Sequence, residues 1–375
     1  MHIAICFDGQ GKHDVRVARK WIKNKPEILG RLQEIQKLLS FDLEEIAFDE
    51  CRANQLDYMQ TLSFIWNQIL FEYYIKKIPF KPAFAFGHSL GHYNALVSAG
   101  VLSFEEVLQV VEERSSLVAR GFSNEQCGML HVKCSDVESF AHLNTLCRLH
   151  SRFGRVLEIS IHNSKHDIVV SYSGYSVQEA REALKEFSLK PLAVQAPYHS
   201  SAMETIGTGF YRVIEPLRPK TPQISVLSNV TARPISEFLC KKDLMLHLTY
   251  PLFMDACMQY CVDQEVNTIV HLSLSNIVPA LLELNCPECS CYHLADPKQE
   301  QAFFLLTEDH NRNVQEEYRK LLGGFSTIAG LPNKKNIDFV KIHNAMTAYQ
   351  NLAGGIGSDE LAHMQKLYGQ ACEAF

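Results

Sequence analysis

The 375-residue sequence lacks several features that each mark a class of protein. No apolar run reaches the 18 or so residues of a transmembrane helix, which predicts a chain that does not enter a membrane. Lysine and arginine number 36 against 42 aspartates and glutamates, whereas nucleic-acid-binding proteins usually carry a basic excess. Residues 1–8 have neither a basic flank nor a cleavage site and predict a first strand, not a signal peptide. We therefore expect a cytoplasmic protein with no nucleic-acid or membrane partner.

A second pair of cysteines with zinc-finger spacing is also missing. The twelve cysteines are scattered, apart from Cys286, Cys289 and Cys291, and such usage is typical of reduced thiols in the cytosol. This cluster and His293 could supply zinc ligands. However, Cys289 and Cys291 alternate as strand residues do, and no second pair exists. We expect a strand here and no metal site.

With 46% hydrophobic residues, the chain can bury a sizeable core. Apolar runs and helical periodicities alternate along its first part, which predicts an α/β fold. We expect strands over residues 2–7 and 82–86, and helices over 56–77, 89–99 and 104–120.

A different pattern between residues 128 and 196 predicts a separate small subdomain. Its order of strand, helix, strand, strand, helix, strand is the ferredoxin-like arrangement. The expected elements are 129–133, 137–149, 156–163, 167–172, 177–187 and 192–196. We expect a large α/β subdomain from residues 1–127 and 197–297, with residues 128–196 inserted in it. Residues 298–375 predict a helical C-terminal extension, broken at Gly323-Gly324, residues 332–336 and Gly354-Gly355.

Gly87-His-Ser-Leu-Gly91 is a G-x-S-x-G motif between a predicted strand and a predicted helix. In that context the serine occupies a sharp turn and the glycines permit the close packing of the backbone. The helix N-terminus supplies oriented N–H groups for a developing oxyanion. Ser89 is therefore the predicted nucleophile, and the N–H of Leu90 a predicted oxyanion donor.

A serine nucleophile needs a base. His199 follows the last strand of the small subdomain and precedes a helix, at a junction where two lobes would form a cleft. His88 competes for this role, but it lies in the turn beside Ser89 and its Cβ direction points it elsewhere. We predict His199 as the base.

Arg114 shares one face of its predicted helix with Val107, Val111 and Val118. An arginine on an inward apolar face must meet an anion, either a protein carboxylate or a bound one, unless it reaches solvent. Its planar fork suits a carboxylate. A substrate with a free carboxylate is therefore a specific hypothesis.

These motifs together resemble the malonyl-CoA:acyl-carrier-protein transacylase family, including stand-alone acyltransferases that serve polyketide synthases. Phe7-Asp-Gly-Gln-Gly-Lys-His13 matches the family's F-P-G-Q-G-S-Q, and residues 87–93 match G-H-S-L-G-E-Y. The family arginine also lies 25 positions after the serine, as Arg114 does. Residues 198–203 match the histidine motif with a following S-x-x-M. The resemblance covers roughly residues 1–297 and implies a hydrolase-like α/β core.

The resemblance also implies roles for further residues. Gln10 matches the glutamine that assists the oxyanion hole, and Gln60 and Asn163 fall in motifs that line the site. A bulky residue such as Tyr198 before the histidine goes with malonyl in the polyketide members. The carbonyl of His247 is expected to orient the catalytic histidine. We also expect His88 to contact substrate.

Several positions depart from the family pattern. Asp8 replaces the proline, Lys12-His13 the Ser-Gln pair, and His92 the glutamate. Leu272-Ser-Leu-Ser-Asn276 replaces a glycine-rich segment. These changes leave the identity of the acyl group open.

The resemblance implies an enzyme that moves a malonyl-type unit from CoA, through a seryl ester, to the phosphopantetheine thiol of an acyl carrier protein. Malonyl-CoA would be a substrate, with no permanently bound cofactor, and the protein a monomer. An acyl-thioester hydrolase of the same fold, transfer of an unusual carrier-bound unit, and a non-catalytic scaffold that docks a carrier protein are the alternatives.

Overall fold

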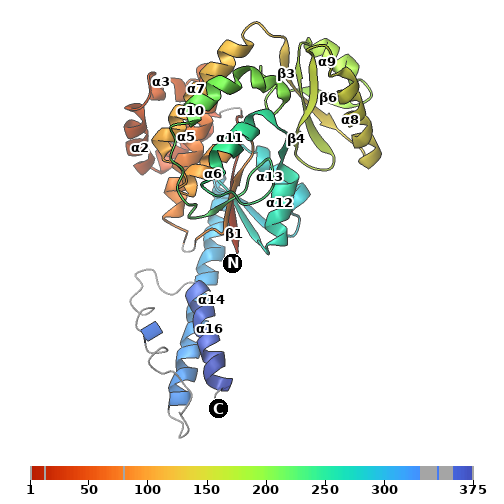
Figure 1. Ribbon diagram of the computed structural model, residues 1–375. Helices are drawn as coiled ribbons and strands as arrows, with labels where there is room; N and C mark the ends of the chain where they lie inside the picture. The colour runs from red at the N-terminus through yellow and green to blue at the C-terminus, as the bar shows by residue number, and fades with distance from the viewer. Residues whose placement is uncertain (1, 12–13, 79–80, 330–343, 346–357, 374–375) are drawn as a thin grey trace. The chain divides into compact units, whose positions relative to one another are not determined.

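The computed structural model describes residues 2–11, 14–78, 81–329, 344–345 and 358–373 (Figure 1). The chain divides into two compact units. The larger unit holds residues 2–73 and 82–296, and the smaller holds residues 74–81 and 297–375 as far as they are described. The finer division at residues 127 and 197 stays a prediction.

A parallel sheet with strand order β10-β9-β1-β2-β7 forms the centre of the larger unit. The register places Phe7 beside Gly87 and Cys6 beside His271. Because the strands are parallel, their carboxyl ends share one edge of the sheet, and ligands of such sheets bind at that edge. The strands are β1 (Ile3–Phe7), β2 (Phe84–Gly87), β7 (Ser225–Val226), β9 (Thr268–His271) and β10 (Ser290–His293).

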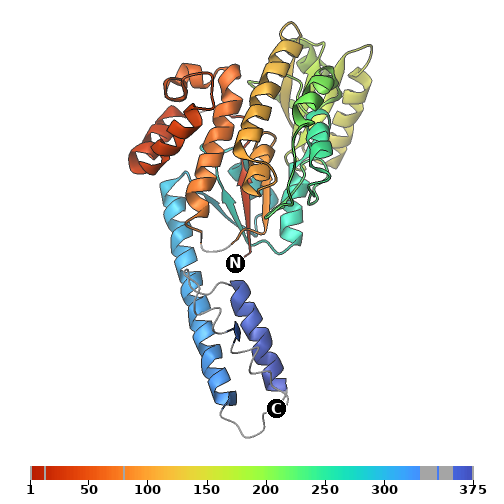
Figure 2. The ribbon, with the colours of Figure 1, turned by 60° about the vertical axis from the view of Figure 1, so that its left-hand side comes forward.

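Helices lie on both sides of this sheet (Figure 2). The expected helices around residues 56–77, 89–99 and 104–120 are confirmed as α5 (Leu56–Ile75), α6 (Gly91–Ser98) and α7 (Phe104–Phe122). The others are α1 (Val15–Asn24), α2 (Glu27–Gln36), α3 (Leu43–Ala47), α4 (Glu50–Ala53), η1 (Ser201–Ile206), α10 (Gly207–Ile214), α11 (Cys240–Thr249), α12 (Met254–Asp263) and α13 (Ile277–Asn285).

A second, mostly antiparallel sheet has strand order β6-β3-β5-β4-β8. Helices α8 and α9 lie beside it, and Leu143 and Ala180 enter its apolar core (Figure 1). The elements are β3 (Cys127–Lys133), α8 (Val137–His150), β4 (Val156–His162), β5 (Asp167–Ser173), α9 (Val177–Ala183), β6 (Ser188–Pro191) and β8 (Leu252–Phe253).

Two expectations for this sheet are wrong. The helix after residue 176 ends at Ala183, and the last strand is Ser188–Pro191 instead of residues 192–196. The pairing of β6 with β3 ends at Pro191, apart from one main-chain hydrogen bond from Leu192 to Met129 over 3.0 Å, and the side chains of Leu192 and Val194 line a cavity in the larger unit. An apolar run next to a binding cavity can therefore imitate a strand.

The smaller unit contains α14 (Pro297–Ala329) and α16 (Ser358–Glu373), which lie side by side (Figure 2). The break expected at Gly323-Gly324 is wrong, because α14 continues through it. A Cβ on Gly324 would lie 2.5 Å from the ring of Tyr368. This glycine therefore permits close packing of the two helices. The expected breaks at residues 332–336 and 354–355 lie outside the described residues.

The cysteine cluster lies at the edge of the parallel sheet. Cys291 and His293 are on β10, which confirms the expected strand. The described residues contain no group of three histidine, cysteine or acidic side chains that could hold a metal ion. Nor does any described helix combine the length and apolar character needed to cross a bilayer.

Candidate active site

Ser89 lies on the sharp turn between β2 and α6. Its φ of +48° falls in the left-handed region, which non-glycine residues rarely adopt and which is found most often at functional sites. Gly91 makes the turn possible, since a Cβ there would lie 2.5 Å from the carbonyl oxygen of Phe7. The glycines of the motif thus let α6 start directly against β1.

His199 meets this serine from a segment 110 residues further along the chain. Its Nε2 lies 2.7 Å from Ser89 Oγ, and its Nδ1 lies 2.6 Å from the carbonyl oxygen of His247. A carbonyl only accepts, so the ring proton is on Nδ1 and Nε2 is free to accept the serine proton. The structure therefore brings Ser89, His199 and the His247 carbonyl together in the predicted arrangement.

Burial is the main cause that lowers the pKa of His199 to about 3; the hydrogen bond to the His247 carbonyl opposes this shift, and the nearby charges of Arg114 and His88 add to it. The imidazole is consequently neutral at physiological pH. A neutral imidazole in contact with a hydroxyl has the protonation state that a general base requires.

Leu90 and Gln10 lie on either side of Ser89, Leu90 at the start of α6 and Gln10 after β1. Neither main-chain N–H has a hydrogen-bond partner among the described residues. The two turns are in close contact, because a Cβ on Gly9 would lie 3.3 Å from Ser89 Cβ. Two free N–H groups beside a nucleophile are suited to an oxyanion hole.

Arg114 lies on α7, whose N-terminus is fixed by the Ser103–Glu106 capping box. Its side chain is only 2% exposed. Nη1 donates to Gln60 Oε1 over 2.5 Å, and Gln60 Nε2 donates to the hydroxyl of Tyr198 over 2.8 Å. The guanidinium carbon lies 4.7 Å from the centre of the Tyr198 ring.

The guanidinium has no counter-charge among the residues that the structure describes. Within the described part of the chain, no carboxylate pairs with Arg114, and neither its Nε nor its Nη2 has a hydrogen-bond partner. A buried charge without a partner is costly. The alternative of an internal ion pair is therefore wrong for the described residues, and a bound anion is the remaining explanation.

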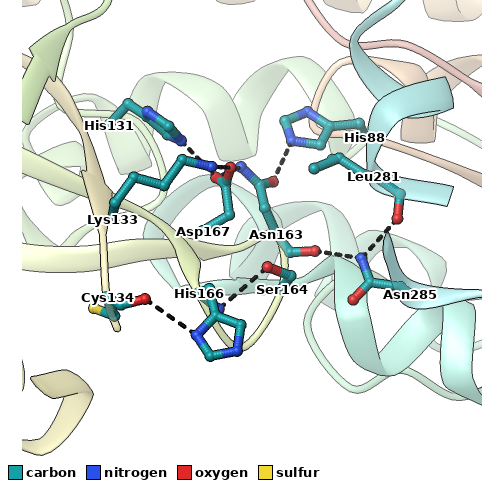
Figure 3. A network of polar contacts seen from close by, with 10 residues as sticks. All are labelled: His88, His131, Lys133, Cys134, Asn163, Ser164, His166, Asp167, Leu281 and Asn285. Carbon is teal, nitrogen blue, oxygen red and sulfur yellow. Dashed lines mark hydrogen bonds and ion pairs between the residues drawn. The ribbon is translucent and has the colours of Figure 1, made fainter. Parts of the chain in front are cut away.

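His88 points toward Asn163 (Figure 3). Its Nε2 lies 2.9 Å from Asn163 Oδ1, and Asn163 Nδ2 donates to Asp167 Oδ1 over 3.0 Å. Asp167 also accepts from His131 and Lys133, each over 2.7 Å. This network connects the turn of the nucleophile with β3 and β5. Sequence reasoning missed His131, Lys133 and Asp167 because no motif marks them.

A cavity of about 600 Å³ opens onto the Ser89–His199 pair. Gln10, His88 and Asn163 also line it. Its remaining walls are largely apolar and include Met59, Met129, Ile161, Leu192, Val194, Ile277 and Leu281. A second cavity of about 510 Å³ shares Gln10 and Tyr198 with the first and also reaches Gln60. Tyr198 therefore stands between the two cavities.

Comparisons with known proteins bear on the family and the fold of this chain. The malonyl CoA-acyl carrier protein transacylase of Staphylococcus aureus strain MW2 is 28% identical over 286 residues, which cover 75% of this chain and 91% of that protein. The same-named protein of Coxiella burnetii has a TM-score of 0.75 at 21% identity, over 81% of this chain and 97% of that chain.

A third similar protein is a malonyl-transacylase solved with the acyl-carrier protein of a type II polyketide synthase. It has a TM-score of 0.73 at 23% identity, over 80% of this chain and 97% of that chain. These likenesses show a shared mixed α/β fold. The profile of the acyl transferase domain matches residues 74–272, which is more than half of the chain. The chain therefore belongs to the acyl transferase domain family.

Proposed function

We propose that this enzyme transfers a malonyl group from CoA, through an ester on Ser89, to the phosphopantetheine thiol of an acyl carrier protein. The observation that carries the proposal is the buried guanidinium of Arg114, which has free donors and lies near the Ser89–His199 pair. A malonyl group has a thioester carbonyl at one end and a carboxylate at the other. The thioester carbonyl can be attacked by Ser89, and the carboxylate can bind the guanidinium of Arg114.

In the first half-reaction His199 Nε2 takes the proton of Ser89 Oγ as this oxygen attacks the thioester carbonyl carbon. The N–H groups of Leu90 and Gln10 stabilise the tetrahedral oxyanion. The C–S bond then breaks, CoA leaves as the thiol with the proton from His199, and malonyl-Ser89 remains. In the second half-reaction His199 deprotonates the carrier thiol, which attacks the ester and releases Ser89.

Arg114 and its neighbours would select the acyl group. Its Nε and Nη2 provide two donors for the malonyl carboxylate, while Gln60 holds Nη1 and fixes the plane of the guanidinium. The Tyr198 ring occupies the space where an α-branch would project, which favours malonyl over methylmalonyl.

Support for the carrier protein comes from the named relatives and from the neighbour solved with such a partner. The largely apolar cavity beside Ser89 has room for the pantetheine arm. We further propose a hydrolase-like core, and a ferredoxin-like lobe formed by β3 to β6 with α8 and α9, since the strand order β6-β3-β5-β4 is that of the ferredoxin arrangement. We also propose that the protein is a monomer in the cytoplasm and has no permanently bound cofactor.

The test is the intact mass of the protein after mixing with malonyl-CoA, with Ser89→Ala as control. We expect a malonyl adduct that is absent from the control and disappears when a holo carrier protein is added, as malonyl-carrier forms. Rapid release of free malonate would instead indicate a thioester hydrolase. If no adduct forms, the donor is not malonyl-CoA, and carrier-bound acyl groups would be the next donors to assay.

A further inference from the structure

A buried, hydrogen-bonded histidine–aspartate pair lies next to the elements that hold Ser89 and His199 and has no part in the chemistry described above. His92 Nε2, on α6, lies 2.8 Å from Asp243 Oδ2, on α11. His92 is fully buried and Asp243 is 5% exposed. The other oxygen of Asp243 accepts a hydrogen bond from Ser228 Oγ. Both carboxylate oxygens thus have a donor, as a buried charge requires.

This pair joins the two helices that hold the two halves of the active site. Helix α6 starts two residues after Ser89, and His92 lies in its first turn. Two carbonyl groups at the C-terminal end of α11 accept hydrogen bonds from His199. The carbonyl of His247 accepts from His199 Nδ1 over 2.6 Å, and the carbonyl of Leu248 accepts from the main-chain N–H of His199 over 3.1 Å. Asp243 lies one turn before His247 on α11, so the two share a helix face.

The ring of His247 fills the space between the pair and the base. It stacks on the His92 ring with centroids 5.0 Å apart and an interplanar angle of 20°. It also meets the His199 ring edge-on, at 5.0 Å and 80°. Burial lowers the pKa of the His247 ring, and a hydrogen bond to the main chain of Ser89 acts in the opposite direction. His247 therefore contacts the serine turn and the His92 ring through its own ring, and His199 through its carbonyl.

We propose that His92 and Asp243 are positioning residues, which set the distance between α6 and α11 and so hold His199 Nε2 against Ser89. The proposal rests on the proposed roles of Ser89 and His199. The hydrogen bond to be maintained is 2.7 Å long. A displacement of about 1 Å would break it, and misplacement of that size can cost about 100-fold in rate.

The identity of residue 92 gives a sharp test. The family motif has glutamate here, but in this chain a glutamate would place a second carboxylate against buried Asp243. Two buried like charges in contact repel strongly. His92→Glu should therefore damage the site although it restores the family residue. His92→Gln is similar in size, and its amide can donate to Asp243 as Nε2 does.

The experiment measures how fast a fluorophosphonate labels Ser89 in the full-length chain. Ser89 Oγ forms a bond to phosphorus, fluoride leaves, and His199 takes the proton, so no acyl donor is needed. We expect His92→Gln to react within about threefold of the natural protein, and His92→Glu to react about 10- to 100-fold more slowly. His142→Ala is the matched control, because His142 pairs with Glu186 over 2.9 Å on the surface. It should react at the natural rate.

A spectroscopic readout separates positioning from a general loss of stability. The proton on His199 Nδ1 should give a downfield NMR signal, retained in His92→Gln and shifted or lost in His92→Glu. If His92→Glu does not fold, the double variant H92E/D243N places an amide against a carboxylate and should restore folding and labelling.

The proposal is overturned if His92→Glu labels as fast as His92→Gln, if the signal is the same in both, or if the double variant folds but does not react. Failure of the natural protein to load malonyl, combined with the expected labelling rates, would refute the proposed substrate and leave the positioning role intact.

Discussion

Replacing Arg114 should change which acyl group the enzyme accepts more than how fast it reacts. In the free protein, Nε and Nη2 are the guanidinium donors without a partner among the described residues. A hydrogen bond that involves a charged group contributes about 1.5–3 kcal/mol, so two would contribute about 3–6 kcal/mol. Dehydration of the substrate carboxylate offsets part of this. At the lower end, about 3 kcal/mol, Arg114→Met should lower kcat/KM for malonyl-CoA about 100-fold.

The assay compares malonyl-CoA with acetyl-CoA, which lacks the carboxylate. We expect the rate with acetyl-CoA to be unchanged or higher in Arg114→Met. Arg114→Lys keeps the charge but loses the planar fork, and should retain an intermediate preference for malonyl. Because the guanidinium is buried without a counter-charge, Arg114→Met should also unfold at no lower denaturant concentration than the natural protein. Equal losses for both donors, together with lower stability, would refute the reasoning and make Arg114 a structural residue.

Four further predictions concern the larger unit. Gly91→Ala should destabilise the fold by about 1–3 kcal/mol and abolish fluorophosphonate labelling, because the added Cβ would lie 2.5 Å from the carbonyl oxygen of Phe7. Gly30→Ala is the contrast: an added Cβ there has no atom within 4 Å, so the variant should stabilise α2 by about 1 kcal/mol. Since the pKa of His199 is about 3, labelling should stay constant between pH 8 and about 5, and an acid limb near 6.5 would contradict this. Because the pKa of His199 is lower in the folded protein, the unfolded chain binds a proton on this histidine at a higher pH than the folded chain does. The free energy of unfolding should therefore decrease as pH falls from about 6.5 toward 3. Tyr198→Ala should connect the two cavities and allow methylmalonyl loading, which intact mass would detect.

The strands and helices that were predicted in the first part of the larger unit could be predicted because each has a local signal. The Ser103–Glu106 capping box starts α7 where expected, and the apolar run before Gly87 is a buried strand. The site residues in sequence motifs could be predicted for the same reason. Ser89 and His199 are each recognisable from their neighbours, and their contact follows from the shared fold.

Features that depend on contacts distant in sequence were not predictable. Asp243 has no motif around it, and its pairing with His92 spans 151 residues. The prediction of a helix break at Gly323-Gly324 was wrong. Gly324 packs against Tyr368 of another helix, and this contact cannot be predicted from the helix propensity of the local sequence. Likewise the run at residues 192–196 has the composition of a strand, and only the position of the cavity shows that it lines a binding space.

Two departures from the family pattern contact each other in the structure. Asp8, in place of the proline, accepts hydrogen bonds from the main-chain N–H groups of Ile277 and Val278, over 3.0 and 2.8 Å, and from Ser275 Oγ. Its own N–H donates to Ser273 Oγ over 2.8 Å. Burial alone would raise the pKa of Asp8, but the charge of His271 and these donors lower it well below its usual value.

The segment that replaces the family's glycine-rich stretch thus supplies the serines that bind the aspartate that replaces the proline. Asp8 lies two residues before Gln10, and Ile277 lines the cavity beside Ser89. These hydrogen bonds therefore connect the oxyanion turn to the N-terminus of α13. Considered singly, each substitution suggests a weakened site. Considered together, they form one set of hydrogen bonds beside the segment of Gln10, so neither argues against the proposed Ser89–His199 pair.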